Sequence, residues 1–502
     1  MVFIGLDVGT TGVKACVFDA DGAIRGYAFR EYDVICAEPG MGEQDADLVW
    51  KLTLEVLREA VSKSGDAASI TSLSLSVQGD AIIAADTDFH PLYPAILGMD
   101  YRSEPQARQC AERFGDRALF DRTGMRPHPM NSVVKMLWLK ERRPGVFAQA
   151  KRIVTYADYI AGRLTGEAVI DHTMASRTMC FDLKTRAWAC DLLEKMGIAP
   201  QLLSRPEQSG KAIGTLLPDI AAATGLGRGV IVAAGGHDQS CAALGAGGID
   251  EGRAVISTGT AEVMSAALRP RTPGKVFFES YYPLYCHTVP DMLFTFALLH
   301  SGGIVFKWYR DNLGTAEAAA ARQSGADPYD LITQAMPEGP SPVMLMPHFN
   351  GSGTPLCDMR SKGAIVGLTM AATRHDIAKA ALEGLCFELR INLDRMQDAG
   401  VEIEELIAVG GGAKSKTWLQ LKADILGRPI ATLAVREAAC LGAGLLAAKA
   451  AGVYPSLADA VKATVRHNDA YHPRPDMAAA YASRFEIYRG LHAALKPVNE
   501  RL

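Results

Sequence analysis

Residues 2–22 read VFIGLDVGTTGVKACVFDADG, and this stretch decides the fold. The apolar runs Val2–Leu6 and Val13–Phe18 flank a turn of glycine and threonine, which predicts two antiparallel strands joined by a tight turn. A second turn at 19–22, rich in Asp and Gly, leads to a third expected strand at Ile24–Phe29. The chain therefore begins with a meander of hairpins.

A second strand–turn–strand unit is expected at Ala254–Ala267, around the turn Ser257–Thr260. Strands are also expected at Ile70–Val77 and at Leu406–Val409, which ends in the glycine run 410–412. Expected helices are Ala46–Lys63, Ile304–Asn312, His375–Gln397 and the small-residue segment Leu441–Ala451. The pattern predicts two α/β halves, each beginning with a Gly/Thr hairpin, with a boundary near Gly245–Gly252.

Composition and charge exclude several classes of protein. The chain has 502 residues, 48% hydrophobic and 22% charged, with a net charge of −4. These values are typical of a soluble globular protein and argue against a nucleic-acid binder or a polybasic membrane protein. No apolar run reaches the ~18 residues of a transmembrane helix, and the N-terminus lacks the basic segment of a signal peptide. Because the ten cysteines include no Cys-x-x-Cys pair, we expect a reduced, cytoplasmic protein.

The first turn has the residue types of a phosphate-binding loop. In Asp7-Val8-Gly9-Thr10-Thr11, glycine lets backbone N–H groups approach a phosphate, and the threonine hydroxyls can donate to its oxygens. The Asp7 carboxylate can hold Mg²⁺ through water. An ordinary hairpin turn explains the same residues equally well. A Walker A motif does not, because no Gly-Lys-Ser/Thr follows at the right spacing.

Later segments add weaker signals. Ser257–Ala261 alone is typical of a plain tight turn, but together with the first turn it suggests two hairpins that converge on one polyphosphate. Asp238 follows a buried strand and two glycines, so it can accept a proton from a substrate hydroxyl; a helix-capping aspartate is the alternative. His237 is expected to be structural. Gly410–Ala413 allows close approach of a flat or anionic ligand, although its position does not suit a dinucleotide-binding unit.

In combination these motifs resemble the FGGY carbohydrate kinases, members of the actin-like ATPase superfamily. The resemblance runs from Phe3 to about Tyr454, and six segments occur in the family's order. They are 5–22 (GLDVGTTGVKACVFDADG), 130–141 (MNSVVKMLWLKE), 235–239 (GGHDQ), 257–261 (STGTA), 363–383 (GAIVGLTMAATRHDIAKAALE) and 410–429 (GGGAKSKTWLQLKADILGRP), the last followed by EAACLGAG. Arg142 departs from the usual polar neutral ending of the second segment.

The resemblance implies an α/β fold of two actin-like (ribonuclease H-like) domains that flank a deep catalytic cleft. The N-terminal domain, 1–247, would bind the sugar and carry the first phosphate loop. The C-terminal domain, 248–455, would bind the nucleotide, and the helical segment 456–502 would pack on it. ATP with Mg²⁺ would be used to phosphorylate a hydroxyl of a small sugar or polyol.

The resemblance also assigns site residues. Asp238 would be the general base, and Asp7 would hold Mg²⁺ through water. The expected ATP and phosphate contacts are Thr10, Thr11, Lys14, Gly259, Thr260, Gly302, Gly303, Gly411, Gly412 and Ala413. The expected substrate contacts are Gln78, Asp80, Asp100, Arg102, Asp238 and Gln239.

The substrate-binding segment departs from the common patterns. Where xylulose kinases usually have Gln-Met-His, this chain has Gln78-Gly79-Asp80; glycerol kinases usually have Gln-Arg-Glu, and some tetritol and L-xylulose kinases are closer. Gly98 and Met99 replace a Trp-Asn pair, so the pocket should be larger or reshaped. Asp80 and Asp100 are expected to form a pair of carboxylates for vicinal hydroxyls, with a turn aspartate as the alternative for Asp80. A ketose such as xylulose is the expected substrate; a tetritol, another polyol, an L-ketose or an aldonate stay open.

Two other functional classes remain for comparison. An actin-like ATPase chaperone or scaffold is disfavoured because no peptide-binding β domain or polymer-forming tail is evident. A nucleotide-dependent sugar sensor without turnover is disfavoured by Asp7 and Asp238, and a dinucleotide oxidoreductase is the weakest rival. The expected partner is a small sugar or polyol, with no nucleic acid or membrane, and a homodimer is left open.

Overall fold

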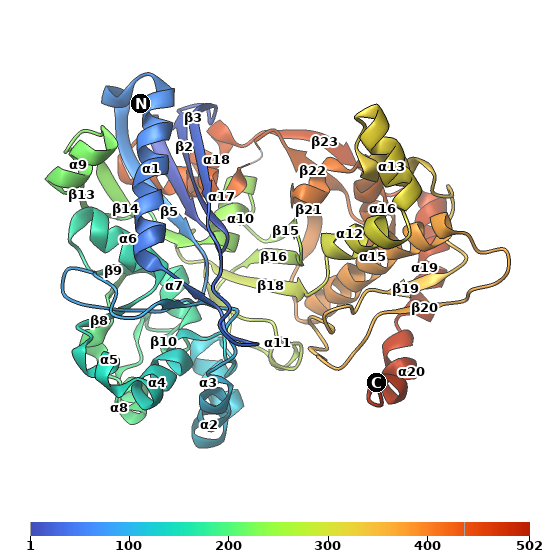
Figure 1. The fold of residues 1–502 in the computed structure, drawn as a ribbon, viewed down its shortest axis with the longest axis horizontal. Helices are drawn as coiled ribbons and strands as arrows, with labels where there is room; N and C mark the ends of the chain where they lie inside the picture. Colours follow the sequence, from blue (N-terminus) through green and yellow to red (C-terminus); the bar gives the residue numbers. More distant parts are fainter. Residues whose placement is uncertain (1, 436) are drawn as a thin grey trace.

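The computed structural model describes residues 2–435 and 437–502. Figure 1 shows two lobes side by side, each built around one sheet. The first sheet has the order β13-β14-β5-β1-β2-β3. Its strands are β1 (Val2–Val8), β2 (Gly12–Asp19), β3 (Ile24–Glu31), β5 (Ile70–Val77), β13 (Ala212–Thr215) and β14 (Ile231–His237). The predicted opening meander and the following strand are thereby confirmed.

The second sheet repeats the central topology of the first, in the order β17-β18-β16-β15-β21-β22-β23. Its strands are β15 (Gly252–Thr258), β16 (Glu262–Leu268), β17 (Tyr285–Cys286), β18 (Leu293–Leu299), β21 (Ile403–Gly410), β22 (Ile430–Leu433) and β23 (His467–Tyr471). In each half a hairpin's first strand also pairs in parallel with a later strand: β1 with β5, and β15 with β21. Both tight turns therefore lie beside the carboxyl end of a parallel neighbour.

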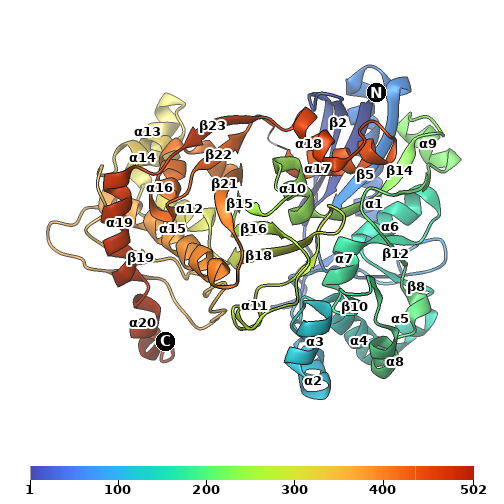
Figure 2. The same cartoon turned by 180° about the vertical axis from the view of Figure 1, so that it is seen from behind.

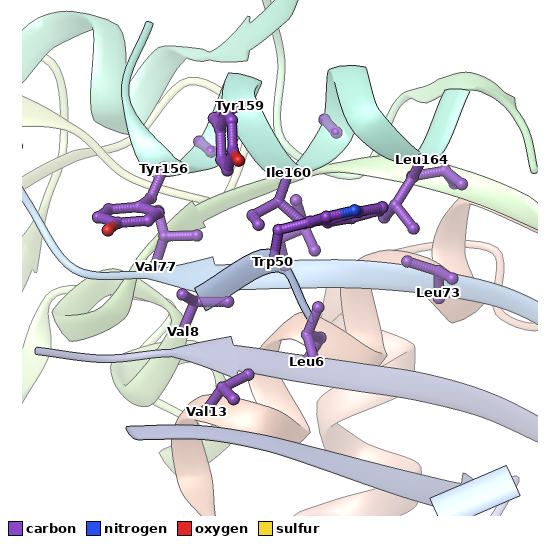
Figure 3. Close-up of a cluster of buried hydrophobic side chains, with 14 of the residues drawn as sticks. Leu6, Val8, Val13, Trp50, Leu73, Val77, Tyr156, Tyr159, Ile160 and Leu164 are labelled. Atoms are coloured by element: carbon purple, nitrogen blue, oxygen red, sulfur yellow. The ribbon is translucent and has the colours of Figure 1, made fainter. Parts of the chain in front are cut away.

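Helices α1 (Ala46–Ser64) and α6 (Tyr156–Thr165) cover one face of the first sheet. Figure 3 shows Trp50 of α1 and Ile160 of α6 above Leu6 and Val8 of β1. Helix α1 begins where the Asp45 side chain accepts hydrogen bonds from two backbone N–H groups of the first turn. The alternating apolar residues of the strands and the helical spacing of α1 thus form one core.

Helix α17 (Ala438–Ala450) covers the opposite face of the same sheet. A Cβ at Gly5 would lie 1.7 Å from the Cys440 carbonyl oxygen, so only glycine permits this approach. Helix α10 (Asp238–Ala246) is just as close, because a Cβ at Gly442 would lie 1.9 Å from the Cys241 oxygen. In Figures 1 and 2, α17 lies beside the first sheet.

Helix α17, which lies within the expected second domain 248–455, thus packs on the first sheet. The sequence did not indicate this packing, because α17 is almost entirely alanine, glycine and leucine, so no polar face indicates which sheet it covers. The C-terminal segment is also divided. Helix α18 (Leu457–Thr464) packs with α17 and β2, whereas α19 (Pro475–Tyr488) packs on α15 (Arg374–Asp398) and α16 (Lys416–Leu426) of the second half.

The remaining elements join and cover the two sheets. The other helices are α2 (Glu104–Phe114), α3 (Asp116–Thr123), α4 (Ser132–Arg142), α5 (Pro144–Gln149), α7 (His172–Arg177), α8 (Cys190–Met196), α9 (Pro218–Thr224), α11 (Lys275–Glu279), α12 (Gly303–Asn312), α13 (Thr315–Ser324), α14 (Pro328–Gln334) and α20 (Leu491–Asn499). Small two-stranded sheets pair β4 (Glu43–Gln44) with β7 (Ala95–Ile96), β6 (Ile83–Ala85) with β8 (Arg152–Val154), β9 (Val169–Asp171) with β12 (Arg205–Glu207), β10 (Phe181–Asp182) with β11 (Ala187–Trp188), and β19 (Met344–Met346) with β20 (Ala364–Val366). Within the described ranges, no helix combines the length and the apolar character needed to cross a membrane.

Candidate active site

The turn between β1 and β2 is fixed through its carbonyl groups. The Tyr32 hydroxyl donates to the Gly9 oxygen at 2.6 Å, and the Gln44 amide donates to the Thr10 oxygen. Gln78 donates to the Gly9 oxygen at 3.2 Å and to the Gln44 side-chain oxygen at 2.9 Å. The Gly9 N–H donates within the turn to the Gly12 oxygen at 2.9 Å. The donor groups of Thr10 and Thr11 are left for a ligand. Tyr32 and Gln44 were not found from the sequence, since neither belongs to a motif.

Asp7 lies at the base of this turn, next to Lys14 on β2. Its carboxylate accepts a 2.7 Å hydrogen bond from Ser76, and its other oxygen lies 3.5 Å from the Lys14 ammonium. Burial raises the pKa of Asp7, and the positive charge of Lys14 opposes that rise. The Lys14 ammonium is itself bonded to Glu437 at 2.8 Å. Lys14 is thus already paired with two carboxylates, so a phosphate would compete with them.

The donor set suits Mg²⁺ held partly by a ligand. In the two described ranges, no group of three or more His, Cys, Asp or Glu residues could form a complete metal cage. Asp7 is a buried carboxylate at the base of the first turn, and Mg²⁺ commonly uses one or two carboxylates together with water and substrate phosphates. Asp7 therefore fits the water-mediated mode expected from the sequence.

The three segments assigned to the nucleotide meet around Thr258. The backbone N–H groups of Gly302 and Gly303 donate to the oxygens of Thr260 and Gly259, both at 2.8 Å. On the other side, Thr258 pairs with Gly410 in the parallel ladder. A Cβ at Gly412 would lie 2.5 Å from the Thr258 methyl carbon, so glycine is needed for this contact.

Gly411, Gly412 and Ala413 belong to a short 3₁₀ helix, Gly411–Lys414, that leads to α16. The fold thus brings together 259–260, 302–303 and 411–413, although the first and the last of these segments lie more than a hundred residues apart in the sequence. Gly259, Thr260 and Gly411 are exposed, so this surface is open to a ligand.

A cavity of about 170 Å³ lies between the first turn and α10. It is lined by Thr10, Gln78, Gly79, Asp80, Leu97, Gly98, Met99, His237 and Asp238. The expected phosphate loop, the expected substrate segment and the expected general base therefore share one cavity. Of the predicted substrate contacts, Gln78, Asp80 and Asp238 line it.

Asp238 is the first residue of α10, and its side chain is 33% exposed. One carboxylate oxygen accepts from the Gln239 backbone N–H at 2.6 Å and lies 3.1 Å from the His237 ring nitrogen. Burial, together with the negative charge of Asp7, raises the pKa of Asp238 to about 7, although Arg177 opposes the rise. The helix-start position and a role as base are therefore compatible, since the helix N–H engages a single oxygen.

His237 is a support for this carboxylate. Its ring bonds to the Tyr285 hydroxyl at 3.1 Å, and its backbone N–H donates to Thr173 at 2.7 Å. Burial lowers the pKa of His237 well below its usual value, so the ring is neutral at pH 7. Gln239 is half-buried in the first turn of α10, where its backbone contacts Asp238.

Asp80 forms a buried ion pair with Arg177 of α7. Its φ of 67° places it in the left-handed region, consistent with the turn alternative as well as with a binding role. The Asp80 oxygen Oδ1 is buried, with no hydrogen-bond partner among the residues that the structure describes. This residue of the cavity wall thus has one carboxylate oxygen that accepts no hydrogen bond and is closed to solvent.

Arg177 was missed by the sequence analysis. It lies 97 positions from Asp80, inside the segment MASRTMCF (174–181), where a single cation among mostly apolar residues was the available signal. Its guanidinium also lies over the rings of Tyr285 and Phe296, at 5.1 and 5.5 Å, so it contacts strands of the second sheet.

Of the expected pair of substrate carboxylates, Asp80 and Asp100, the structure places only Asp80 on the wall of this cavity. Asp100 is fully buried and accepts from the Gly42 N–H at 2.7 Å and from Arg102 at 2.9 Å. Arg102 in turn donates to Glu43 at 2.6 Å. Asp100 and Arg102 therefore fix the loop behind the cavity instead of lining it. The physical reason is that Arg102 neutralises the Asp100 carboxylate, for which the sequence analysis had assigned no partner.

Gly98 and Gly79 shape the cavity together. A Cβ at Gly98 would lie 2.9 Å from the Gly79 oxygen and 3.3 Å from the Asp80 Cβ. A Cβ at Gly79 would lie 2.8 Å from the His237 ring. The glycines at positions 79 and 98, which both depart from the usual sequence pattern, thus act together, because a larger residue at either position would displace the Asp80 turn.

Family models describe nearly the whole chain. Residues 2–245 match the N-terminal domain of the FGGY family of carbohydrate kinases, and residues 254–451 match its C-terminal domain. The chain belongs to this family. As an FGGY kinase it is an ATP-dependent enzyme that phosphorylates a carbohydrate hydroxyl. It has the two-domain actin-like fold that the motifs predicted.

Individual relatives agree with this placement. The chain is 29% identical to the xylulose kinase of Bacillus subtilis (strain 168), over 99% of this chain and 98% of the relative. The crystal structure of a ligand-bound xylulose kinase from Lactobacillus acidophilus superposes with a TM-score of 0.90 at 26% identity, over 100% of this chain and 99% of the other. A gluconate kinase from Lactobacillus acidophilus has a TM-score of 0.89 at 27% identity, covering 98% of both chains. The chaperone, scaffold, sensor and oxidoreductase alternatives are not supported.

Proposed function

We propose that this FGGY kinase phosphorylates a small, uncharged ketose such as xylulose, with Asp238 as the general base. The observation that carries the proposal is the shared cavity of Thr10, Asp80 and Asp238. Its volume is about 170 Å³. A short hydroxylated chain suits such a cavity better than a disaccharide.

The charges favour a neutral substrate over an aldonate. None of the nine lining residues is Lys or Arg, and the lining includes two aspartates. The buried cation Lys135 donates to the Asp80 and Met130 carbonyl groups, behind the cavity wall, and burial lowers its pKa to about 8. Arg177 already pairs with Asp80 from outside the lining, so a substrate carboxylate would meet the Asp238 carboxylate without a cation among the lining residues.

In the proposed reaction, Asp80 Oδ1 accepts a hydrogen bond from one substrate hydroxyl. Asp238 accepts the proton of the hydroxyl that attacks the terminal phosphorus of ATP, and the bond from that phosphorus to the ADP oxygen breaks. The Thr10, Thr11 and Gly259–Thr260 donors hold phosphate oxygens, and Gly302–Gly303 and Gly411–Ala413 line the nucleotide. Mg²⁺, when bound near Asp7, supplies positive charge that neutralises the phosphates.

A tetritol or L-ketose is the second candidate. The observation that favours it is the joint change at Gly79, Asp80 and Gly98, which gives this cavity a wall unlike the Gln-Met-His pattern. The size and charge arguments above apply equally to these compounds.

The test is ADP release with Mg-ATP across ketoses, tetritols, pentitols, glycerol and aldonates. A ketose with the highest kcat/KM supports the proposal, and a tetritol or L-ketose moves the assignment to the second candidate. An aldonate as the preferred substrate contradicts the charge argument.

A cytoplasmic location and a homodimer stay predictions. Cell fractionation with a fractionation marker tests the first. Sedimentation velocity of the purified chain tests the second.

A further inference from the structure

An ion pair is sealed beneath the second phosphate turn. Lys422 of α16 and Glu262 at the start of β16 are each 0% exposed, and their charged atoms lie 2.5 Å apart. The Lys422 ammonium also donates to the Thr258 hydroxyl at 2.8 Å, and that hydroxyl donates to Glu262 at 2.5 Å. Three residues from β15, β16 and α16 thus form a closed triangle of hydrogen bonds.

Stability alone is a weak reason for such a pair. Removing two charges from water is costly, and apolar residues of similar volume often pack equally well or better. The other near neighbour of the Lys422 ammonium is the Trp418 ring, 4.5 Å away. The Glu262 oxygen Oε2 is buried without a hydrogen-bond partner among the described residues, so the pair is not even fully satisfied.

The triangle adjoins the 259–260 turn and the 410–413 segment, and it reaches Gly302 and Gly303 through that turn. Thr258 directly precedes the Gly259–Thr260 turn, whose oxygens accept the Gly302 and Gly303 N–H groups. The Thr258 side chain also supports Gly412, and its strand neighbour is Gly410. Any rotation of the Thr258 side chain would therefore shift the contact between the phosphate turn and the adenosine segment.

We propose that Lys422 and Glu262 are positioning residues for ATP: they fix Thr258, and through it the spacing between the 259–260 turn and the 410–413 segment. The inference rests on the assignment of these segments to the nucleotide. Neither charge reaches the ligand, because both are sealed; the pair acts through backbone geometry. Such misplacement alone can change binding or rate substantially.

The helix α16 offers a matched control. Two residues after Lys422, Asp424 is equally buried and pairs with Arg474 at 2.7 Å, which joins α16 to the C-terminal segment. This second pair also joins a buried charge of α16 to an opposite charge, although the Arg474 side chain is 50% exposed, and it does not contact Thr258. Loss of the Asp424 pair should lower the melting temperature without changing the KM for ATP.

The experiment compares K422M, E262Q and the double variant K422M/E262M with D424N. We expect the first three to raise the KM for ATP and the Kd for ADP by about ten- to a hundredfold, with the KM for the sugar within about twofold. The double variant removes both charges, so it keeps the test valid where a single variant leaves an unpaired charge and does not fold.

The inference is overturned when K422M/E262M binds ADP as the parent does, or when D424N changes the KM for ATP equally. ADP affinity is measured by calorimetry without sugar, so its result is independent of the substrate assignment. A failed sugar panel combined with a loss of ADP affinity in K422M would thus reject the proposed substrate and retain the positioning role.

Discussion

The two halves repeat one hairpin topology but keep their charges in different places. Beneath the first turn, Asp7 is 8% exposed and the Lys14 side chain is 29% exposed. Beneath the second turn, Glu262 and Lys422 are completely sealed. The charges beneath the first turn can therefore lie next to a ligand, whereas the charges beneath the second turn can act only through the shape of its backbone. The same hairpin topology thus places reactive charges in the first half and structural charges in the second half.

The sugar side shows the same contrast on a smaller scale. Asp80 and Asp100 are both buried carboxylates paired with an arginine, but Asp80 alone of the two lines the cavity and has an oxygen without a partner. A buried pair is thus a binding group only where one atom stays available to the cavity.

The largest expected effect follows from removing the negative charge of the Asp238 carboxylate. Asp238→Asn keeps the size of the side chain and the bond from the Gln239 N–H but removes the proton acceptor. We expect kcat to fall by about a hundred- to ten-thousandfold, with ADP affinity unchanged, as measured by coupled assay and calorimetry. Turnover near the parent rate would remove Asp238 from the role of base.

The second effect separates the two buried carboxylates. Asp80→Asn should raise the KM for the sugar by about ten- to a hundredfold because it replaces an available acceptor and unpairs Arg177. Asp100→Asn is the matched control and should lower the melting temperature while leaving the sugar KM nearly unchanged. An equal rise of the sugar KM in both variants would show that Asp100 also binds substrate.

The third effect is the pH dependence of kcat/KM, which follows from the ionisation of Asp238 in the first half. The Asp238 pKa is raised to about 7, and the base must be ionised to accept a proton. At subsaturating sugar and ATP, kcat/KM should therefore fall about tenfold per pH unit below pH 7 and level off above it. A profile flat between pH 5.5 and 8 would contradict this ionisation.

Local patterns predicted most of the fold and the segments of the site. Alternation predicted β1, β2 and β5, and helical spacing predicted α1, because these signals lie within a few residues of one another. The partners Asp80–Arg177 and Glu262–Lys422 are 97 and 160 positions apart, so no local pattern indicates them. The side of the molecule that α17 covers was equally hidden, since its small residues are alike on all faces. What sequence reasoning missed is therefore mainly which distant charges neutralise each other.

The smallest expected effect tests whether the two turns hold the same polyphosphate. Thr11 and Thr260 are both exposed, so replacing either with alanine should leave the melting temperature unchanged. Each lost hydrogen bond should raise the KM for ATP by about fivefold. In Thr11→Ala/Thr260→Ala the two free-energy changes should add, because the turns come from different sheets and share no side-chain partner. If Thr11→Ala raises the KM for ATP and Thr260→Ala does not, the second turn contributes through its backbone and not through the Thr260 hydroxyl.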